Sequence, residues 1–428
     1  MTTPPEGLLE VLVESIGARG DGIARDGGKP VYVPYVLPGE RVRVKPLAAR
    51  GEGIAATLVK VLTASAERVE PPCPLFGRCG GCALQHASPA SYRDWKRARV
   101  ATALHRRGLH GVAVADLMAT PPASRRRATL MAARRGKTVV VGFHQRAGKR
   151  LVDLTSCAIL EPALFALIAP LRESLGAVLR PEGQCAVQVN LVDTGADILI
   201  RDRALPGPDA RQALAALADR VDAARLSWCA GDSIEPIAWR RPALVRFGEV
   251  TVEPPPGAFL QASREGEKLI QKQVADALRS ARAIADLYAG LGSLSLPLAG
   301  AAAIQAVEAD AGAVAALDRA VRAASLTDYR IERRDLARSP LAAAELARFD
   351  AVLFDPPRAG ALDQARMLAA SRVPLVVAVS CDPESFARDA RVLIDGGYEL
   401  ESVQPIDQFV WSAEVELVAG FRRKARHS

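Results

Sequence analysis

The clearest candidate for chemistry is Cys381, which lies in the stretch VPLVVAVSCDPESFARD over residues 373–389. The apolar run from Val373 to Val379 is typical of a strand buried on both faces, and Pro383 suits the first turn of a helix. Cys381 is therefore expected between a strand and a helix, where open α/β sheets bind ligands and a helix dipole favours a thiolate. We interpret Cys381 as a catalytic nucleophile; the alternative is a small buried apolar side chain.

A turn with two glycines offers a second site. Gly290 and Gly292 follow the first expected strand of the C-terminal region, and glycines there allow a ligand to approach the backbone closely. Glu308 ends the second strand, where a carboxylate can bind both hydroxyls of a ribose. Because Ser295 replaces the third glycine of a dinucleotide fingerprint, S-adenosylmethionine is favoured over NAD. Asp335, after the third strand, is placed to meet the adenine amino group.

The segment Asp355-Pro356-Pro357-Arg358 ends a fourth expected strand. A carboxylate before two prolines makes a rigid, extended turn. Nucleic-acid methyltransferases use Asp/Asn-Pro-Pro-aromatic turns against the target base, and Arg358 in place of the aromatic disfavours methylation of an amino group. The alternative is a plain turn.

Three cysteines lie in a loop rich in proline and glycine. Cys73, Cys79 and Cys82 have the spacing Cys-x5-Cys-x2-Cys, and Cys157 is a distant fourth. Four thiolates suit either Zn²⁺ or a [4Fe–4S] cluster, and the spacing alone does not decide between them. Disulfides or unrelated core cysteines are the third alternative, disfavoured because the 7 cysteines come with no secretion signal pattern.

Strand-like and helix-like segments alternate from about residue 283. Helices are expected at 291–302, directly after the glycine turn, and at 311–324, 363–371 and 384–394. This alternation predicts a doubly wound parallel sheet.

The first 62 residues have a different pattern. Short strand-like runs between glycine and proline turns predict a small barrel, a fold that often binds oligonucleotides. The region that follows is expected to be α+β. Its basic residues are densest at Arg125, Arg126, Arg127, Arg134, Arg135 and Lys137. Phosphate contact is favoured for them over a merely solvated surface.

Composition limits the class of protein. A chain of 428 residues, 49% hydrophobic, predicts two or three domains with large cores. The net charge of +8 suits an anionic partner such as nucleic acid. No purely apolar run of about 18 residues occurs, so we expect no membrane span. The lack of a secretion signal pattern predicts a cytoplasmic protein, which we expect to be a monomer.

Four motifs together resemble those of the RNA 5-methyluridine methyltransferases. They are Gly257-Ala-Phe-Leu-Gln261, Asp286-Leu-Tyr-Ala-Gly-Leu-Gly292, Asp355-Pro-Pro-Arg-Ala-Gly360, and Ser380-Cys-Asp-Pro383 with Ala387-Arg-Asp389. The resemblance extends over nearly the whole chain. Residues 1–62 resemble the TRAM barrel of this family, and the cysteine spacing resembles the iron–sulfur site of its ribosomal-RNA members.

The resemblance implies a role for each candidate residue. An S-adenosylmethionine site would be formed by Gln261, Tyr288, Gly290, Gly292, Ser293, Glu308, Asp335 and Asp355. Cys381 would be the nucleophile and Glu416 the proton acceptor. Glu414 stands where the family usually has His, on the same strand face as Glu416, so which carboxylate acts stays open. Cys73, Cys79, Cys82 and Cys157 would hold a [4Fe–4S] cluster.

The implied fold is α/β, with a TRAM/OB-like β-barrel at 1–62 and a Rossmann-like methyltransferase domain at 246–428. The central α+β domain, 63–245, would carry the cluster and a helix at about 89–110 that packs on the catalytic domain. The implied activity is methylation of uridine C5 in RNA, with 23S rRNA favoured. Alternatives are a tRNA uridine-C5 methyltransferase, a non-catalytic iron–sulfur RNA-binding protein, and a DNA cytosine-C5 methyltransferase, whose Pro-Cys motif is missing.

Overall fold

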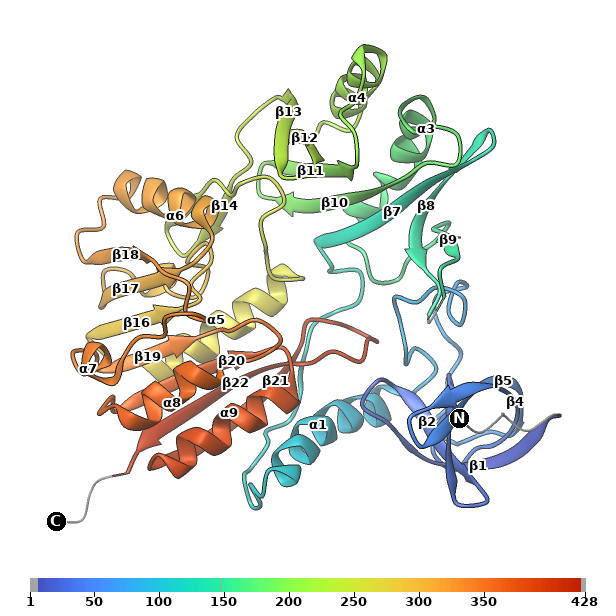
Figure 1. Ribbon diagram of the computed structural model, residues 1–428, viewed down its shortest axis with the longest axis horizontal. Coiled ribbons are helices and arrows are strands. Elements are labelled where there is room, and N and C mark those ends of the chain that lie inside the picture. The colour runs from blue at the N-terminus through green and yellow to red at the C-terminus, as the bar shows by residue number, and fades with distance from the viewer. Residues whose placement is uncertain (1–6, 147, 425–428) are drawn as a thin grey trace.

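The structure is a computed structural model that describes residues 7–146 and 148–424. Figure 1 shows three parts: a barrel near the N-terminus, a sheet with helices in the middle of the chain, and a second sheet with helices in the C-terminal half. Within the described ranges, no helix is both long and apolar enough to cross a membrane.

The first five strands close into a barrel in the order β1-β2-β3-β5-β4. They are β1 (Leu9–Ile16), β2 (Asp21–Asp26), β3 (Lys29–Pro34), β4 (Arg41–Arg50) and β5 (Gly53–Thr63). Alternate valines such as Val31 and Val33 point into the core of the barrel, as the two-residue period of a strand requires. The predicted small barrel is therefore confirmed.

The central part is a seven-stranded sheet in the order β13-β12-β11-β10-β7-β8-β9. Its strands are β7 (Arg127–Arg135), β8 (Thr138–His144), β9 (Leu151–Asp153), β10 (Gln184–Val192), β11 (Gly195–Asp202), β12 (Arg225–Ala230) and β13 (Ser233–Trp239). The helices are α2 (Pro162–Phe165), α3 (Ile168–Val178) and α4 (Pro208–Arg220). Because α3 packs on β7 and β8, and α4 on β12 and β13, one face of the sheet carries the core.

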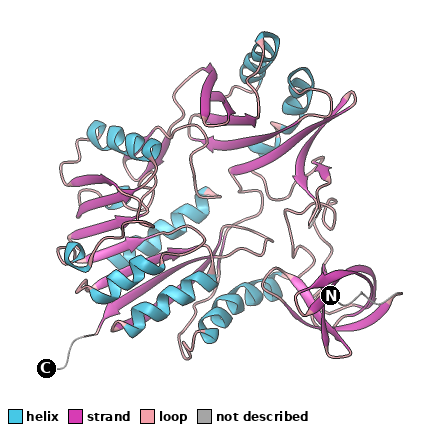
Figure 2. Ribbon diagram, viewed as in Figure 1, coloured by secondary structure: helices cyan, strands magenta, loops and turns pink. Residues whose placement is uncertain are grey.

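The C-terminal part is an eight-stranded sheet in the order β18-β17-β16-β19-β20-β22-β21-β6 (Figure 2). The strands are β6 (Met118–Ala119), β16 (Ala283–Leu287), β17 (Ala303–Glu308), β18 (Tyr329–Arg333), β19 (Ala351–Phe354), β20 (Leu375–Ser380), β21 (Tyr398–Asp407) and β22 (Glu416–Arg423). The helices are α5 (Arg264–Leu278), α6 (Ala311–Ala323), α7 (Ala343–Leu346), α8 (Leu362–Ala370) and α9 (Pro383–Asp395). A hairpin, β14 (Val245–Phe247) and β15 (Val250–Val252), precedes them.

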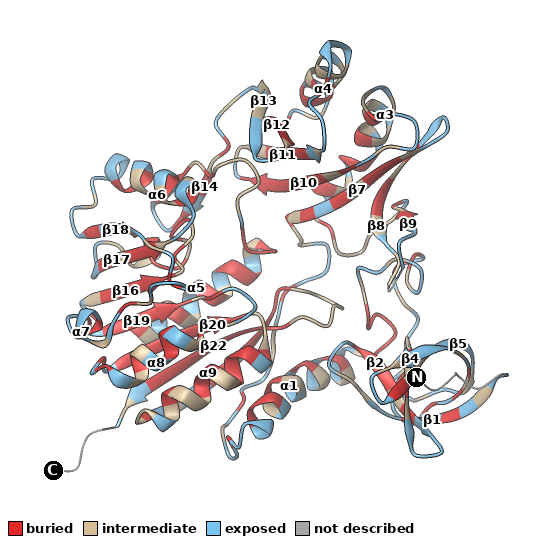
Figure 3. Ribbon diagram, in the orientation of Figure 1, coloured by how far each residue is buried: buried red, intermediate tan, exposed pale blue. Residues whose placement is uncertain are grey.

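The strand before Cys381 is buried on both faces (Figure 3). Val376 and Ala378 pack in a cluster with Phe386 of α9, while Val377 belongs to a second cluster with helix α5. Layers on both faces make this an α/β sheet with parallel central strands, as the apolar run predicts.

The prediction of a helix at 291–302 is wrong. The segment after the glycine turn forms only a 3-10 turn, η1 (Leu296–Leu298). Gly290 and Gly292 both have positive φ, 56° and 76°, a conformation that a right-handed helix does not contain. The apolar residues of this segment therefore line a turn rather than a helix face.

One helix lies beside a part of the chain far from it in sequence. The helix α1 (Pro89–Arg106) packs against α9 at the edge of the C-terminal sheet (Figure 1). The strand β6, which follows α1, pairs with β21 through Met118 and Ala119. The chain thus contributes to the C-terminal sheet before it forms the central one.

Candidate active site

Three candidate side chains converge at the ends of the central strands. Cys381 directly follows β20, and Asp355 follows β19, the parallel neighbour of β20. Glu416 begins the antiparallel strand β22, and the pairing of Ser380 with Leu417 brings Glu416 beside Cys381. The charges of Glu416 and Asp355 both raise the pKa of Cys381, so the three side chains are close enough to interact electrostatically.

The thiol of Cys381 is protonated at neutral pH. Burial is the largest cause of its raised pKa, about 12, and the nearby carboxylates of Glu416 and Asp355 add to it. The guanidinium of Arg358 acts in the opposite direction. A thiolate must therefore form against the effect of burial and of the two carboxylates, and the positive charge of Arg358 favours it.

The helix after Cys381 does not activate the sulfur as its position in the sequence predicts. Asp382 caps α9, and its carboxylate accepts hydrogen bonds from the N–H groups of Glu384 and Ser385, both at 3.0 Å. These first amides of the helix are directed at Asp382. The carboxylate thus occupies the positive end of the helix dipole.

Glu416 is buried and linked to Gln408. Burial and the charge of Asp355 raise the pKa of Glu416. Gln408 donates from Nε2 to Oε2 of Glu416 and to Oε1 of Gln261, each at 2.7 Å. Its Oε1 accepts the N–H of Ala262 at 2.9 Å. A carboxyl group whose pKa is raised towards neutrality is a better proton acceptor.

Sequence reasoning missed Gln408. The residue directly follows β21 and belongs to none of the motifs, and its partner Gln261 is 147 positions away. Local pattern gives no signal for such a contact.

Glu414 occupies a different environment from Glu416. Its carboxylate pairs with Arg358 at 3.0 Å, and its side chain is 36% exposed. The charge of Glu414 still contributes to the raised pKa of Glu416. The two carboxylates therefore do not share one buried position: Glu416 faces Cys381, and Glu414 faces the guanidinium.

The helix α1 holds the loop between β21 and β22. Lys96, which is fully buried, pairs with Asp407 at the start of the loop. Its Nζ also donates to the carbonyls of Phe409 at 3.1 Å and Glu414 at 2.6 Å. Tyr92 donates to the second oxygen of Asp407 at 2.6 Å. One ammonium group thus fastens both ends of the loop that carries Gln408.

A cavity of about 560 Å³ adjoins the three convergent side chains. Among the sequence candidates, its lining includes Gln261, Tyr288, Gly290, Ser293, Glu308 and Asp355. Asp355 both lines the cavity and influences Cys381. A ligand in this cavity would therefore lie next to the thiol.

Glu308 closes the glycine turn at the cavity. Its Oε2 accepts the N–H of Gly290 at 2.8 Å, and its Oε1 accepts the N–H groups of Ala309 and Asp310 at 2.7 and 2.8 Å. The neighbouring Tyr288 has φ of 64°, a left-handed conformation that costs energy for a residue with a side chain and recurs at functional sites. A fixed carboxylate beside a tight turn suits the vicinal hydroxyls of a ribose.

Two of the predicted cofactor-binding residues, Gly292 and Asp335, are not among the described residues that line this cavity. A Cβ at Gly292 would lie within 3.0 Å of Leu317, Leu296 and Tyr329, so this glycine is needed for close packing. Asp335 is exposed after β18, where its carboxylate accepts the N–H of Ala337 at 3.0 Å. Its charge still helps to raise the pKa of Tyr288.

The four candidate metal ligands line one cavity of about 200 Å³: Cys73, Cys79, Cys82 and Cys157. Burial raises the pKa of Cys82 to about 12, and the other three cysteines add to the shift. Within the parts of the chain that the structure describes, no group of three or more His, Cys, Asp or Glu side chains is placed to hold a metal ion. The structure therefore brings the thiols together without showing the predicted iron–sulfur site.

The dense basic run of the central part is largely occupied within the protein. Arg126 is buried and pairs with Glu267 at 2.9 Å. Arg134 donates to the carbonyls of Gly176 and Leu179, both at 2.9 Å. Arg126 and Arg134 therefore stabilise the fold, whereas Arg135 and Lys137 of the same run are exposed, and phosphate contact by the run stays a prediction.

Comparisons with known proteins agree with this architecture. The TRAM domain family matches residues 8–47. An uncharacterized RNA methyltransferase of Brucella suis is 45% identical, over 96% of this chain and 97% of that protein. The 23S rRNA (uracil(1939)-C(5))-methyltransferase RlmD of Chromohalobacter salexigens is 35% identical, over 94% of this chain and 87% of that protein.

A solved structure shares the fold. The tRNA (uracil-54, C5)-methyltransferase of Pyrococcus abyssi, in complex with S-adenosyl-L-homocysteine, superposes with a TM-score of 0.75 at 21% identity. The match covers 96% of this chain and all of that one. The fold is thus that of an S-adenosylmethionine-dependent methyltransferase with an N-terminal TRAM barrel. With relatives of 35% to 45% identity over nearly its full length, the chain belongs to the RNA methyltransferase family.

Proposed function

We propose that this enzyme transfers a methyl group from S-adenosylmethionine to carbon 5 of a uridine in 23S rRNA, through a covalent adduct on Cys381. The observation that carries the proposal is the meeting of Cys381, Asp355 and Glu416 at the border of the 560 Å³ cavity. Ribosomal RNA is chosen because the 35% identical relative carries that name. The tRNA enzyme, at 21% identity, supports the fold alone.

The reaction needs a nucleophile because carbon 5 of uracil is unreactive by itself. The Cys381 thiolate adds to carbon 6, and the resulting enolate attacks the sulfonium methyl through carbon 5, which releases S-adenosylhomocysteine. Glu416 then removes the proton from carbon 5. The double bond between carbons 5 and 6 re-forms as the sulfur leaves.

Glu416 is proposed as the base rather than Glu414. Its carboxylate lies beside Cys381, and its raised pKa makes it a competent proton acceptor. Gln408 donates a hydrogen bond to Oε2 of Glu416, which would leave Oε1 of Glu416 to accept the proton of the substrate. Glu414 is engaged with Arg358.

The proposed donor site is the large cavity. Glu308 would bind the ribose hydroxyls, and Gln261, Tyr288, Gly290 and Ser293 would surround the rest of the cofactor. Asp355 would lie between the donor and the target base. Asp335 and Gly292 remain proposed members of the site through their effects on Tyr288 and on the turn.

We also propose that Cys73, Cys79, Cys82 and Cys157 hold a [4Fe–4S] cluster. Four thiols on one cavity are a donor set suited to iron–sulfur or zinc, and the resemblance favours iron. When bound, the cluster would tie the loop of Cys73–Cys82 to the central sheet. Absorption at about 400 nm in anaerobically purified protein would support it; stoichiometric zinc without that absorption would contradict it.

The proposed division into domains follows the three parts of the fold. The TRAM barrel occupies 1–62, the central RNA-binding domain 63–245 and the methyltransferase domain 246–428; residues 1–6 and 425–428 of these ranges lie outside the described residues. The packing of α1 on α9 supports a contact between the central segment and the catalytic domain.

The experiment that tests the function uses S-adenosylmethionine with a labelled methyl group. Protein-free 23S rRNA and bulk tRNA are incubated separately with the enzyme, and modified nucleosides are mapped by mass spectrometry. We expect 5-methyluridine in 23S rRNA. Methylation at another atom, or 5-methyluridine in tRNA alone, would contradict the proposal.

A further inference from the structure

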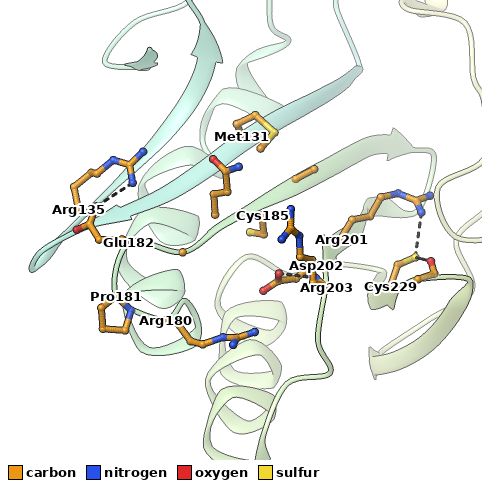
Figure 4. Close-up of a pocket in the computed structure, with 14 residues that line it drawn as sticks. Met131, Arg135, Arg180, Pro181, Glu182, Cys185, Arg201, Asp202, Arg203 and Cys229 are labelled. Atoms are coloured by element: carbon orange, nitrogen blue, oxygen red, sulfur yellow. Dashed lines mark hydrogen bonds and ion pairs between the residues drawn. The ribbon is translucent and has the colours of Figure 1, made fainter. Parts of the chain in front are cut away.

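A groove of about 780 Å³ lies on the central sheet (Figure 4). Its floor includes four register partners on β7, β10, β11 and β12: Met131, Ala186, Arg201 and Cys229. Register partners project from the same face of a sheet. Their sequence neighbours belong to the core beneath α3 and α4: Leu130, Val187, Ile200 and Trp228. The groove therefore lies on the face opposite these helices.

The groove contains arginines whose positive charge is not neutralised by an ion pair within the described residues. Arg180, Arg201 and Arg203 are exposed, and within the described ranges none of the three forms an ion pair. The side chain of Arg201 donates a hydrogen bond to the sulfur of Cys229 at 3.1 Å. Figure 4 shows Arg180 and Arg203 between that contact and the Arg135–Glu182 ion pair.

The groove leads to the cofactor cavity. Arg201 lines both hollows. One row further along the same sheet face, Gln188 donates to the carbonyl of Gly257 at 2.9 Å, and Gly257 lines the cavity. A chain molecule lying along the groove would therefore reach the edge of the proposed methyl donor site.

We propose that this groove binds the sugar–phosphate backbone of the single-stranded RNA that flanks the target uridine. Arg180 and Arg203 contact phosphates, and Arg201 guides the strand where groove and cavity meet. Free guanidinium groups suit phosphate geometry, and the half-buried side chain of Met131 on the floor offers an apolar contact for bases. The inference rests on the proposed function, because it names the surface by which that enzyme holds its substrate.

The test is the double variant Arg180→Gln/Arg203→Gln, with a fluorescein-labelled single-stranded RNA 20-mer of mixed sequence as the probe. Each lost phosphate contact makes the slope of log K against log salt less steep by about 0.7, so the loss of two contacts makes it less steep by about 1.4. At about 0.1 M salt this corresponds to a roughly 25-fold weaker affinity, and the difference disappears near 1 M salt. Arg180→Lys/Arg203→Lys, which keeps both charges, is expected to bind within a few-fold of the wild type.

The matched control is Arg279→Gln/Arg372→Gln. These two exposed arginines precede β16 and β20, at the opposite ends of the strands from Cys381, and the same charge is lost. The proposal is overturned if the groove variant keeps wild-type affinity and salt slope, or if the control loses as much. A wild-type enzyme that binds the probe but forms no 5-methyluridine in 23S rRNA would refute the proposed function, whereas the binding measurements would still test the groove.

Discussion

The structure makes a specific prediction about Lys96, a residue remote from the catalytic sulfur in sequence. Lys96 is fully buried, and it joins Asp407 to the carbonyls of Phe409 and Glu414. Replacing it with methionine keeps an unbranched side chain one atom shorter, but leaves the buried carboxylate of Asp407 with only Tyr92 and the N–H of Phe409 as donors. The loop that carries Gln408 should then open more often.

The expected loss of stability in the loop follows from the burial of the Lys96–Asp407 pair. Burial lowers the pKa of Lys96 to about 8 in spite of Asp407, so the attraction of the carboxylate does not offset the desolvation of the ammonium group. Removing one partner of such a pair nevertheless costs about 3–5 kcal/mol, because the other charge stays buried. At 1.4 kcal/mol per factor of ten, protection from hydrogen exchange over residues 407–416 should fall roughly 100- to 5,000-fold.

The assay is hydrogen–deuterium exchange read by peptide mass, together with the rate of methyl transfer. Lys272→Met is the matched control, because Lys272 forms an exposed pair with Asp276 on α5 and surface pairs contribute about 0–1 kcal/mol. Lys96→Met/Asp407→Asn should recover part of the lost protection, since no charge remains buried. Unchanged exchange in Lys96→Met, with unchanged kcat, would refute the role assigned to the loop.

Three further predictions concern the groups around Cys381. Glu416→Gln should lower turnover by roughly 10²- to 10⁴-fold, the usual effect of losing a general base, and should accumulate a covalent enzyme–RNA adduct visible as a shifted band on a denaturing gel; turnover near the wild-type rate would exclude Glu416 as the base. Because burial and two carboxylates raise the pKa of Cys381 to about 12, the thiolate fraction grows tenfold per pH unit below that value, so kcat/KM should rise between about pH 7 and 9. Arg358→Gln removes the charge that favours the thiolate and should lower kcat/KM severalfold in this range, whereas Arg358→Lys should lower it less; equal values for both variants would contradict the electrostatic role of Arg358.

Local patterns predicted the parts of the fold that are set by periodicity. The apolar run before Cys381 is buried on both faces because sheet and helix layers enclose it, and alternating valines made the barrel recognisable. The helix at 291–302 was predicted for the same kind of reason, but Gly290 and Gly292 with positive φ override the apolar pattern.

Contacts between distant residues were beyond sequence reasoning. Lys96 and Asp407 are 311 positions apart, and Gln408 and its hydrogen-bond partner Gln261 are 147 positions apart. The arginines of the central part illustrate the same limit. The density of charge in the sequence does not show that Arg126 pairs with Glu267 inside the protein, or that Arg180 and Arg203 are exposed and form no ion pair within the described ranges.

The most direct test of the account is to trap the bond to Cys381. RNA containing 5-fluorouridine allows the thiolate to add and the methyl group to transfer, but the fluorine at carbon 5 cannot be removed as a proton, so the adduct persists. Intact-protein mass spectrometry after nuclease digestion should show wild-type enzyme carrying a methylated fluorouridine nucleotide, and Cys381→Ala should carry none while still binding S-adenosylmethionine. The same mass increase on Cys381→Ala, or undiminished methylation of ordinary RNA by that variant, would contradict the central claim.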